Sequence, residues 1–271
     1  MEGAPPDTPP PPPPPSSVPI VKLKVVGKKE AFVSDTSKTF SSHWSLGGWR
    51  REKEKRGPCL LPDSLRIVSF NVYFGKLERE ERALALFEHV LRYDPDIIAF
   101  QECTLEFIKL VKECTAFRKS YSLCPDSGFS AAAGCWYGVC FLVKSSLRFA
   151  TVIHTTLPSG MGRTLLSLQF EDGFVSTGHF ESLANATLRR QQLEIAADLA
   201  GKEKFHLICG DFNMKEDENK SIPAGYVDGW TSLYPNDQGE KEDEQKKRRI
   251  RCFKKKKKRF DLDHRQCYHF D

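Results

Sequence analysis

Four short apolar segments of this chain end in polar residues that can bind a metal ion, move a proton or contact a phosphate. The residues that follow these segments are, in order, Asn71, Gln101 with Glu102, His179 with Glu181 and Ser182, and Asp211 with Asn213. Taken singly, an asparagine in such a place closes a turn and a carboxylate caps a helix. If the segments are strands of one fold, their ends meet on one rim and bring these side chains together.

Such a set suits the hydrolysis of a phosphodiester. A hard divalent cation prefers oxygen ligands, and Mg²⁺ usually keeps several waters, so one carboxylate with one amide is enough, and Glu102 is the expected ligand. Asp211 is placed to orient or deprotonate the attacking water, while the Asn213 amide donates to a phosphoryl oxygen as charge develops. His179 either donates a hydrogen bond to the same phosphate or is a satisfied histidine beside the core.

The elements that must position these residues follow from the hydrophobic pattern after about residue 62. Strands are expected at Leu65–Val72, Asp96–Phe100, Trp136–Val143, Leu147–His154, Arg163–Phe170, Phe174–Gly178 and Phe205–Cys209. Helices are expected at Arg79–Tyr93, Leu105–Glu113 and Thr187–Ala200. Strands dominate and helices are inserted between them. This order predicts two sheets packed face to face and covered by helices.

The polar strand ends belong to short motifs whose order and approximate spacing resemble those of the endonuclease/exonuclease/phosphatase superfamily. The motifs are Ser69-Phe70-Asn71, Phe100-Gln101-Glu102, Gly178-His179-Phe180-Glu181-Ser182 and Gly210-Asp211-Phe212-Asn213. Within the superfamily, the tyrosyl-DNA phosphodiesterase branch is favoured by Met161-Gly162-Arg163-Thr164-Leu165-Leu166, by Arg189 with Gln192-Leu193, and by Arg259-Phe260-Asp261. The resemblance is carried by residues 65–213, a little over half the chain.

The resemblance implies a fold, a cofactor and a substrate. The fold would be a four-layered α/β sandwich, in which two packed mixed β-sheets are flanked by helices. The activity would be a hydrolase reaction that needs Mg²⁺, for which Mn²⁺ can substitute. The substrate would be the bond between a tyrosine and a 5′ DNA phosphate, as left by a trapped topoisomerase. That function implies DNA ends as partners and DNA repair in the nucleus, with the cytoplasm as a second location.

The resemblance also assigns residues to roles. Asn71 and Glu102 fall on the metal side of the site, and Asp211 and Asn213 on the pair that handles water and phosphate. His179 falls on the phosphate-contacting histidine. The remaining matches are Arg163, Ser182 and Arg189, expected to bind the substrate or support the site, and Asp261, expected at a catalytic position.

The C-terminus departs from the family pattern. Family members end with an S-D-H motif on a separate strand, whose Asp lies at the metal and whose His stabilises the transition state. Here Arg259-Phe260-Asp261 is followed at once by Asp263-His264, and the chain stops at Asp271. Because this pair is too close to Asp261 to end a separate strand, we expect that the final core strands are absent and that the chain is poorly active.

Length and composition bound the other possibilities. The chain has 271 residues, 39 % of them hydrophobic, which is enough for one core of catalytic size. The nearly uncharged run 131–143 is too short for a bilayer, which needs about 18 to 20 residues. Nine cysteines without a C-x-x-C pair indicate reduced thiols rather than a disulfide framework. We expect a monomer without a membrane segment.

The domain organisation is expected to have three parts. Nine of the eleven residues from Pro5 to Pro15 are proline, so residues 1–17 are expected to form a disordered leader. Residues 18–62 are expected to form an accessory arm and linker of unknown role. The catalytic domain would span residues 63–271 and contain a basic insert at 240–259.

The basic insert accounts for the positive charge of the chain. Residues 240–259 hold twelve Lys or Arg against four Asp or Glu, a balance of +8, whereas the whole chain carries +5. Attraction to a polyanion would therefore be concentrated in this segment and weaken with salt. Two interpretations remain: a nuclear import signal or phosphate contact, and a solvated loop.

Two alternative functions compete with removal of tyrosyl adducts. The first is a nuclease or another phosphodiesterase of the same superfamily, because a fold does not select a substrate. The second is a catalytically dead protein that keeps the fold and binds nucleic acid. The missing S-D-H motif favours the second alternative, whereas the retained Asn71, Glu102, Asp211 and Asn213 favour an enzyme.

Overall fold

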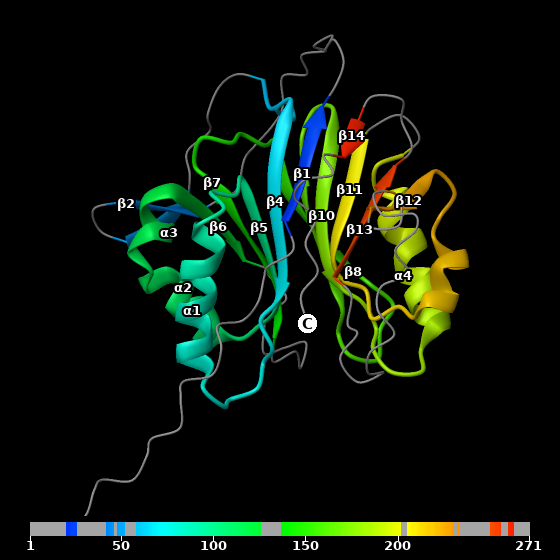
Figure 1. The fold of residues 1–271 in the computed structure, drawn as a ribbon, viewed down its shortest axis with the longest axis horizontal. Helices are drawn as coiled ribbons and strands as arrows, with labels where there is room; N and C mark the ends of the chain where they lie inside the picture. Colours follow the sequence, from blue (N-terminus) through cyan, green and yellow to red (C-terminus); the bar gives the residue numbers. More distant parts are fainter. Residues whose placement is uncertain are drawn as a thin grey trace, which may run out of the picture.

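The computed structural model describes residues 58–125, 137–201, 205–229 and 232, together with the backbone of five further strands. Two β-sheets pack face to face in the centre, and helices cover the outer face of each (Figure 1). The helices α1 (Arg79–Leu91), α2 (Leu105–Glu113) and α3 (Thr115–Ser120) lie on one side, and α4 (Ala186–Asp198) lies on the other. The prediction of a four-layered α/β sandwich is confirmed.

The first sheet has eight strands. In spatial order they are β14 (Phe260–Leu262), β1 (Ile20–Val25), β4 (Ser64–Asn71), β5 (Ile97–Cys103), β7 (Gly138–Lys144), β6 (Tyr121–Pro125), β2 (Ser42–Ser45) and β3 (Gly48–Arg51). The pair β4–β5 is parallel and its neighbours are antiparallel, so the sheet is mixed.

The second sheet has six strands and is also mixed. In spatial order they are β12 (Tyr226–Asp228), β13 (Ile250–Lys255), β11 (Phe205–Asp211), β10 (Gly173–His179), β9 (Thr164–Gln169) and β8 (Thr151–Thr156). Here β10 and β11 are the parallel pair. A short 3₁₀ helix, η2 (Glu216–Ser221), follows β11.

Apolar residues fill three layers between these elements. One cluster lies between the sheets, one lies between the first sheet and α1–α3, and one lies between the second sheet and α4. Every residue of β5, β10 and β11 is buried, because both faces of each strand are covered. These three fully buried strands form the rigid base from which the polar strand ends project.

Most predicted elements are present, with shifted ends. Helix α2 has the bounds that the sequence predicts, but β5 continues to Cys103 instead of ending at Phe100, and β8 begins at Thr151 instead of Leu147. The sequence pattern did not predict α3, β6, η2 or β12, which are short. Their length explains the omission, because a few residues contain too little periodicity to be recognised.

The domain limits differ from the expected division at two places. Strand β1 pairs with β4, and Cys59 and Leu61 are buried against the core, so part of the expected arm belongs to the sandwich. Within the expected basic insert, Ile250–Lys255 forms β13 between β11 and β12, so a solvated loop does not describe this part. The expected disordered leader, residues 1–17, lies outside the described residues, as does the rest of 240–259 apart from β13.

The parallel pair β10–β11 depends on one glycine. Gly210 lies opposite Gly178 and has a φ of 142°, a conformation that disfavours any side chain. A Cβ atom at residue 210 would stand 2.1 Å from the carbonyl oxygen of Gly178. The close approach of these strands is therefore possible only with glycine at this position.

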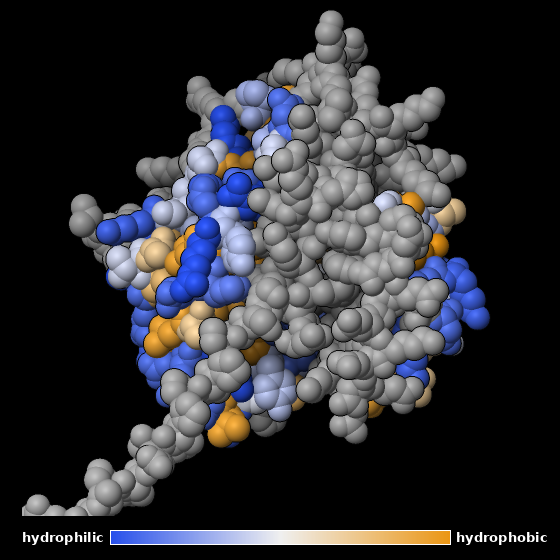
Figure 2. Space-filling view, viewed as in Figure 1, coloured by the Kyte–Doolittle hydropathy of each residue, from blue (hydrophilic) through white to orange (hydrophobic). Residues whose placement is uncertain are grey.

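The described surface is mostly polar on the face in Figure 2, with separate small apolar areas on the side of α1 and α2. Large apolar side chains that are exposed include Leu77, Leu84 and Leu105. None of the helices in the described part of the chain is long and apolar enough to cross a membrane.

Candidate active site

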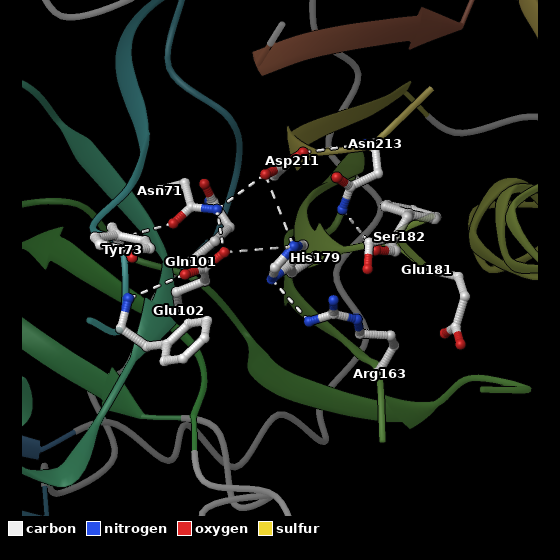
Figure 3. A network of polar contacts seen from close by, with 12 residues as sticks. Asn71, Tyr73, Gln101, Glu102, Arg163, His179, Glu181, Ser182, Asp211 and Asn213 are labelled. Carbon is white, nitrogen blue, oxygen red and sulfur yellow. Dashed lines mark hydrogen bonds and ion pairs between the residues drawn. The ribbon is translucent and has the colours of Figure 1, made fainter. Parts of the chain in front are cut away.

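The polar residues singled out in the sequence converge where four strands end. Asn71 lies opposite Gln101 at the ends of the parallel strands β4 and β5, and His179 lies opposite Asp211 at the ends of β10 and β11. Because the sheets face each other, the two pairs of strand ends meet across the sandwich (Figure 3). Asn71 and Glu102 come from the first sheet, and His179 and Asp211 come from the second.

The two carboxylates of the site are bridged by an amide. The Asn71 Nδ2 atom donates to Glu102 Oε1 at 2.8 Å and to Asp211 Oδ2 at 2.9 Å. Its Oδ1 atom accepts a hydrogen bond from the backbone N–H of Tyr73 at 2.9 Å. This contact fixes the orientation of the amide, with nitrogen toward the carboxylates. In this orientation the amide nitrogen of Asn71, which is not a metal-binding atom, faces the two carboxylates, and the prediction that Asn71 is a metal ligand stays a prediction.

A local irregularity of β5 turns Glu102 into the site. The register between β5 and β7 shifts between Phe100 and Cys103, and Glu102 itself has a φ of 59°. Its second carboxylate oxygen, Oε2, accepts from the backbone N–H of Phe74 at 3.0 Å. Just after the strand, the Thr104 hydroxyl caps α2 by accepting from the N–H of Phe107. The bulge and the cap together fix where the carboxylate points.

Glu102, His179 and Asp211 could together hold a metal ion. One ligand atom from each lies within 4.8 Å of the other two. Glu102 is 2 % exposed and Asp211 is 1 % exposed, so two carboxylates are buried close together. Buried carboxylates are stable as anions only beside compensating charge or hydrogen-bond donors. The arrangement therefore fits a divalent cation with oxygen ligands.

His179 faces both carboxylates with one ring nitrogen and an arginine with the other. Its Nε2 atom lies 3.8 Å from Glu102 Oε1 and 3.7 Å from Asp211 Oδ2. Its Nδ1 atom lies 2.8 Å from Nη1 of Arg163, which precedes β9. Both residues are buried. The predicted site residue Arg163 thus contacts His179 directly.

Asp211 is oriented by the chain that follows it. Its Oδ1 atom accepts from the backbone N–H of Asn213 at 3.0 Å, and Asn213 has a φ of 49°. The Asn213 amide nitrogen donates to the carbonyl oxygen of Phe180 at 3.0 Å. An amide nitrogen has two hydrogens, so Asn213 keeps a second donor for a ligand.

The side chains of Glu181 and Ser182, which belong to the same motif as His179, point in different directions. Glu181 points away from the carboxylates (Figure 3) and accepts hydrogen bonds from the Ser159 hydroxyl and from the backbone N–H of Gly160. The Ser182 hydroxyl lies at the site and donates to the Met161 sulfur at 3.2 Å. Glu181 therefore holds the loop before β9, while Ser182 faces the site region.

The described contacts of Arg189 hold the structure together and do not include the carboxylates of Glu102 and Asp211. It is almost fully buried and forms a two-point ion pair with Glu218 at 2.8 and 2.7 Å. The same guanidinium donates to the carbonyl oxygens of Glu181 and Leu183. Four hydrogen bonds to the protein do not support the prediction that Arg189 binds substrate and instead agree with the supporting role.

Asp261 is not brought to the site. It lies opposite Lys24, and Lys24 lies opposite Ser64, which is the first residue of β4. Asn71, at the site, is the last residue of the same strand. The backbone register thus places Asp261 at the far end of the sheet, which does not support a catalytic position. Asp263 and His264 lie outside the described residues.

The sequence analysis did not place three neighbours at the site: Phe74, Tyr137 and Met161. Tyr137 stacks on Phe74, with ring centroids 4.8 Å apart, and its hydroxyl accepts from Arg163. The Met161 sulfur accepts from Arg163 and Ser182. A tyrosine beside an apolar strand resembles any core residue, whereas the match of the segment around Arg163 was a usable signal for Met161.

Beneath the site, the two sheets are joined by polar side chains. Gln101 Nε2 donates to the hydroxyls of Ser69 and Thr177, which belong to opposite sheets. Burial raises the pKa of the neighbouring Cys209 thiol to about 12, so this thiol stays protonated at neutral pH. The base of the site is therefore neutral, and its charge is confined to the rim.

A sequence model described as the Endonuclease/Exonuclease/phosphatase family matches residues 68–238, more than half of the chain. The chain belongs to this family. The predicted membership of the endonuclease/exonuclease/phosphatase superfamily is confirmed.

Individual members of the endonuclease/exonuclease/phosphatase family refine this placement. Tyrosyl-DNA phosphodiesterase 2 of Danio rerio is 25 % identical over 182 residues, which are 62 % of this chain and 47 % of that protein. The chain thus spans about half the length of this curated relative. The crystal structure of D. rerio TDP2 complexed with a single-strand DNA product superposes with a TM-score of 0.58 at 23 % identity, covering 71 % of this chain and 84 % of that one.

Proteins that are not named as tyrosyl-DNA phosphodiesterases share this fold. The human Nocturnin catalytic domain, solved with a bound sulfate anion, has a TM-score of 0.52 at 16 % identity, covering 69 % of this chain and 80 % of that one. At such identities the likeness shows the fold alone. These likenesses therefore do not identify a substrate for this chain.

Proposed function

We propose that this chain hydrolyses phosphodiesters with the help of a divalent cation. The observation that carries the proposal is the convergence of Glu102, His179 and Asp211, with ligand atoms within 4.8 Å, at the ends of four strands. Two buried carboxylates beside a histidine, reached from two sheets, are more than a fold needs for its stability. The family to which the chain belongs supports the same chemistry.

Mg²⁺ is the cation that the donor set fits best, and Mn²⁺ would substitute for it. Glu102 would hold it, with Asp211 close by, because hard cations prefer carboxylate oxygens to nitrogen or sulfur. When bound, such a cation polarises the phosphoryl oxygens and neutralises their developing charge. The described sulfurs nearest the site belong to Met161 and to buried cysteines, so nothing here favours a softer metal.

The side chains divide the remaining work. Asp211 accepts a proton from the attacking water, since its carboxylate is fixed by Asn71 on one oxygen and by the Asn213 backbone on the other. The water oxygen then bonds to phosphorus while the ester bond to the leaving oxygen breaks. His179 and the second amide hydrogen of Asn213 donate to the phosphoryl oxygens.

The specific substrate we propose is the bond between a tyrosine and the 5′ phosphate of DNA. The 25 % identity with D. rerio tyrosyl-DNA phosphodiesterase 2 and the shared motif positions support this choice. The partners would then be DNA 5′ ends that carry tyrosyl adducts, the process DNA repair, and the main location the nucleus. A nuclease or another phosphodiesterase is the second candidate, because the matched family is described by nuclease and phosphatase activities and a fold does not select a substrate.

A substrate panel tests the proposal. The purified chain is incubated with a 5′-tyrosyl oligonucleotide, the unmodified oligonucleotide and a lipid phosphodiester, each with and without Mg²⁺. We expect Mg²⁺-dependent release of tyrosine from the first substrate only, at the low rate that the absence of an S-D-H sequence predicts. Cleavage of the unmodified strand would favour a nuclease, and binding of DNA without hydrolysis would favour the catalytically dead alternative.

Two variants connect any activity to this site. Glu102→Gln keeps the shape of the side chain but removes its charge, so it should raise the Mg²⁺ concentration needed for turnover. Glu113→Gln, on the exposed surface of α2, is the matched control and should leave the Mg²⁺ requirement unchanged. Equal metal dependence of Glu102→Gln and the parent protein would remove Glu102 from the ligand set.

The nuclear location can be tested through the basic segment. Lys246–Arg249 precedes β13, so its replacement by serine leaves the residues of that strand intact. We expect weaker nuclear accumulation of a fluorescent fusion in cells. Unchanged accumulation, with unchanged salt dependence of DNA binding, would leave the solvated-loop interpretation for the part of the segment before β13.

A further inference from the structure

The contact between Arg163 and His179 determines which ring nitrogen of the histidine carries a hydrogen. Arg163 Nη1 lies 2.8 Å from His179 Nδ1, and the two residues are 4 % and 5 % exposed. A guanidinium has five N–H donors and no acceptor, and it stays protonated in proteins. The Nδ1 atom must therefore offer its lone pair, and the ring hydrogen must reside on Nε2.

The opposite side of the ring is compatible with the assignment that the Arg163 contact gives. Nε2 faces Glu102 Oε1 at 3.8 Å and Asp211 Oδ2 at 3.7 Å, and carboxylate oxygens only accept. A ring with its hydrogen on Nδ1 would press an N–H against the guanidinium and a lone pair against two anions. The Arg163 contact thus selects one tautomer, and the carboxylates agree with it.

Arg163 is itself held in place by groups from other segments. Its Nη1 also donates to the Tyr137 hydroxyl at 3.3 Å, and its guanidinium carbon lies 5.5 Å from the centroid of the Tyr137 ring. Its Nη2 donates to the Met161 sulfur at 3.6 Å. The guanidinium therefore has several fixed contacts in addition to the histidine, and its direction does not depend on a ligand.

We propose that Arg163 is a positioning residue that fixes the Nε2–H tautomer of His179, so that the ring donates a hydrogen bond into the site and does not bind metal. A ring nitrogen that carries a hydrogen has no lone pair in the ring plane for a cation. The cluster of Glu102, His179 and Asp211 therefore divides into two carboxylates that can face a cation and one donor that faces a phosphoryl oxygen. Only the phosphoryl acceptor rests on the proposed function; the tautomer does not.

Nitrogen-15 NMR of the imidazole rings tests the tautomer without substrate or metal. Protein with ¹⁵N-labelled histidine is measured at neutral pH by long-range ¹H–¹⁵N correlation, and the signals of residue 179 are assigned by their loss in His179→Gln. We expect a protonated Nε2 and an unprotonated, hydrogen-bonded Nδ1. A hydrogen on Nδ1, or on both nitrogens, would overturn the proposal.

Variants at position 163 separate positioning from mere folding. Arg163→Gln removes the obligate donor and should produce a mixture of the two tautomers, whereas Arg163→Lys keeps a donor and should retain Nε2–H. Arg190→Gln, which removes an arginine from an exposed pair on α4, should change nothing. An unchanged spectrum in a folded Arg163→Gln variant would contradict the proposal. If that variant does not fold, the spectrum of the parent protein still decides.

Two further measurements separate this inference from the proposed function. Addition of Mg²⁺ should leave the hydrogen on Nε2, and its loss on metal binding would show His179 to be a ligand. If the chain hydrolyses the tyrosyl substrate, Arg163→Gln should lower kcat by about 10- to 100-fold with a smaller change in KM, as for other residues that orient a functional histidine. Failure of hydrolysis in the parent protein would overturn the function but leave the tautomer measurement intact.

Discussion

The two sheets meet their covering helices through interfaces of different character. Under α1–α3 the contacts are aromatic. The centroid of the Phe87 ring lies 6.5, 5.6 and 4.9 Å from the ring centroids of Phe100, Phe107 and Phe117, respectively. Beside α4, apolar residues are combined with the buried Arg189–Glu218 ion pair. We refer to these regions as the aromatic half and the ion-pair half.

The two kinds of contact suit the different parts of the site that the two halves hold in place. Glu102, on the aromatic half, lies near the end of a buried strand and is aimed by the local bulge and the Thr104 cap. On the ion-pair half, the segments around Met161 and Ser182 have no regular structure of their own. Hydrogen bonds that Arg189 and Gln192 donate, and one that the Glu181 carboxylate accepts, fix them instead. Apolar packing sets the place of an element, whereas hydrogen bonds set the direction of an irregular one.

The largest effect is expected from the carboxylate at the end of β11. Asp211→Asn keeps the size of the side chain but removes the proton acceptor, so turnover at saturating Mg²⁺ should fall by about 10²- to 10⁴-fold. Substrate binding should be largely kept. Steady-state kinetics measure both, with Glu194→Gln on the exposed surface of α4 as the control. A loss confined to KM would show that Asp211 acts in binding rather than in proton transfer.

The next effect tests the ion-pair half directly. Arg189→Met leaves Glu218 as a buried, uncompensated charge and should lower the free energy of unfolding by about 3 to 5 kcal/mol. The double variant Arg189→Met with Glu218→Leu removes both charges and should recover a large part of this loss. Denaturant unfolding of the two single variants and the double variant measures the coupling. Additive losses would mean that the ion pair is not what holds this half.

The aromatic half should respond in a smaller and graded way. Ile108→Val removes one buried methyl group from α2 and should cost about 0.5 to 1.5 kcal/mol of unfolding free energy. The Mg²⁺ requirement of any activity should stay the same, because packing in this half does not aim Glu102. Chemical denaturation and a metal titration are the measurements. A changed metal requirement would show that the two halves are less separate than their contacts indicate.

A pH-dependent effect concerns the layer between the two halves. Burial raises the pKa of the Cys209 thiol from 9.0 to about 12, so the unfolded chain releases this proton at a lower pH than the folded one. The stabilisation is therefore complete below about pH 9 and is lost as pH rises toward about 12. Unfolding free energies at about pH 8 and about pH 10.5 should differ less in Cys209→Ala than in the parent protein. An equal decline in both would assign the alkaline loss to other groups, such as Tyr226, whose pKa is raised by burial as well.

Sequence alone predicted the residues that end strands and missed those whose partners are distant. Glu102 and Asp211 were recognisable because apolar runs of strand length precede them. The ion pair of Arg189 was not, since Glu218 is 29 residues away in a polar stretch that resembles any loop. The orientation of the Asn71 amide could not be predicted either, because it depends on a backbone N–H two residues later and on a carboxylate 140 residues away.

The same limit explains the misjudged elements. Strand β13 consists of Ile-Arg-Cys-Phe-Lys-Lys within a run of basic residues. Its composition predicted no strand and left an import signal, a phosphate contact and a solvated loop as interpretations. It became a strand because β11 offers it an unpaired edge, which is a property of the whole sheet. The bulge that aims Glu102 leaves no local signal, because it results from a mismatch between β5 and β7.

The missing Cβ of Gly210 also determines how this chain would tolerate random mutation. Glycine 210 takes no part in any proposed step, yet the 2.1 Å approach to the Gly178 carbonyl oxygen leaves no room even for alanine. Alanine there would force apart the two strands that end in His179 and Asp211. In a saturation library, substitutions at position 210 should therefore abolish function as completely as substitutions of the two carboxylates. The positions that tolerate no substitution would then include a residue that has no functional group.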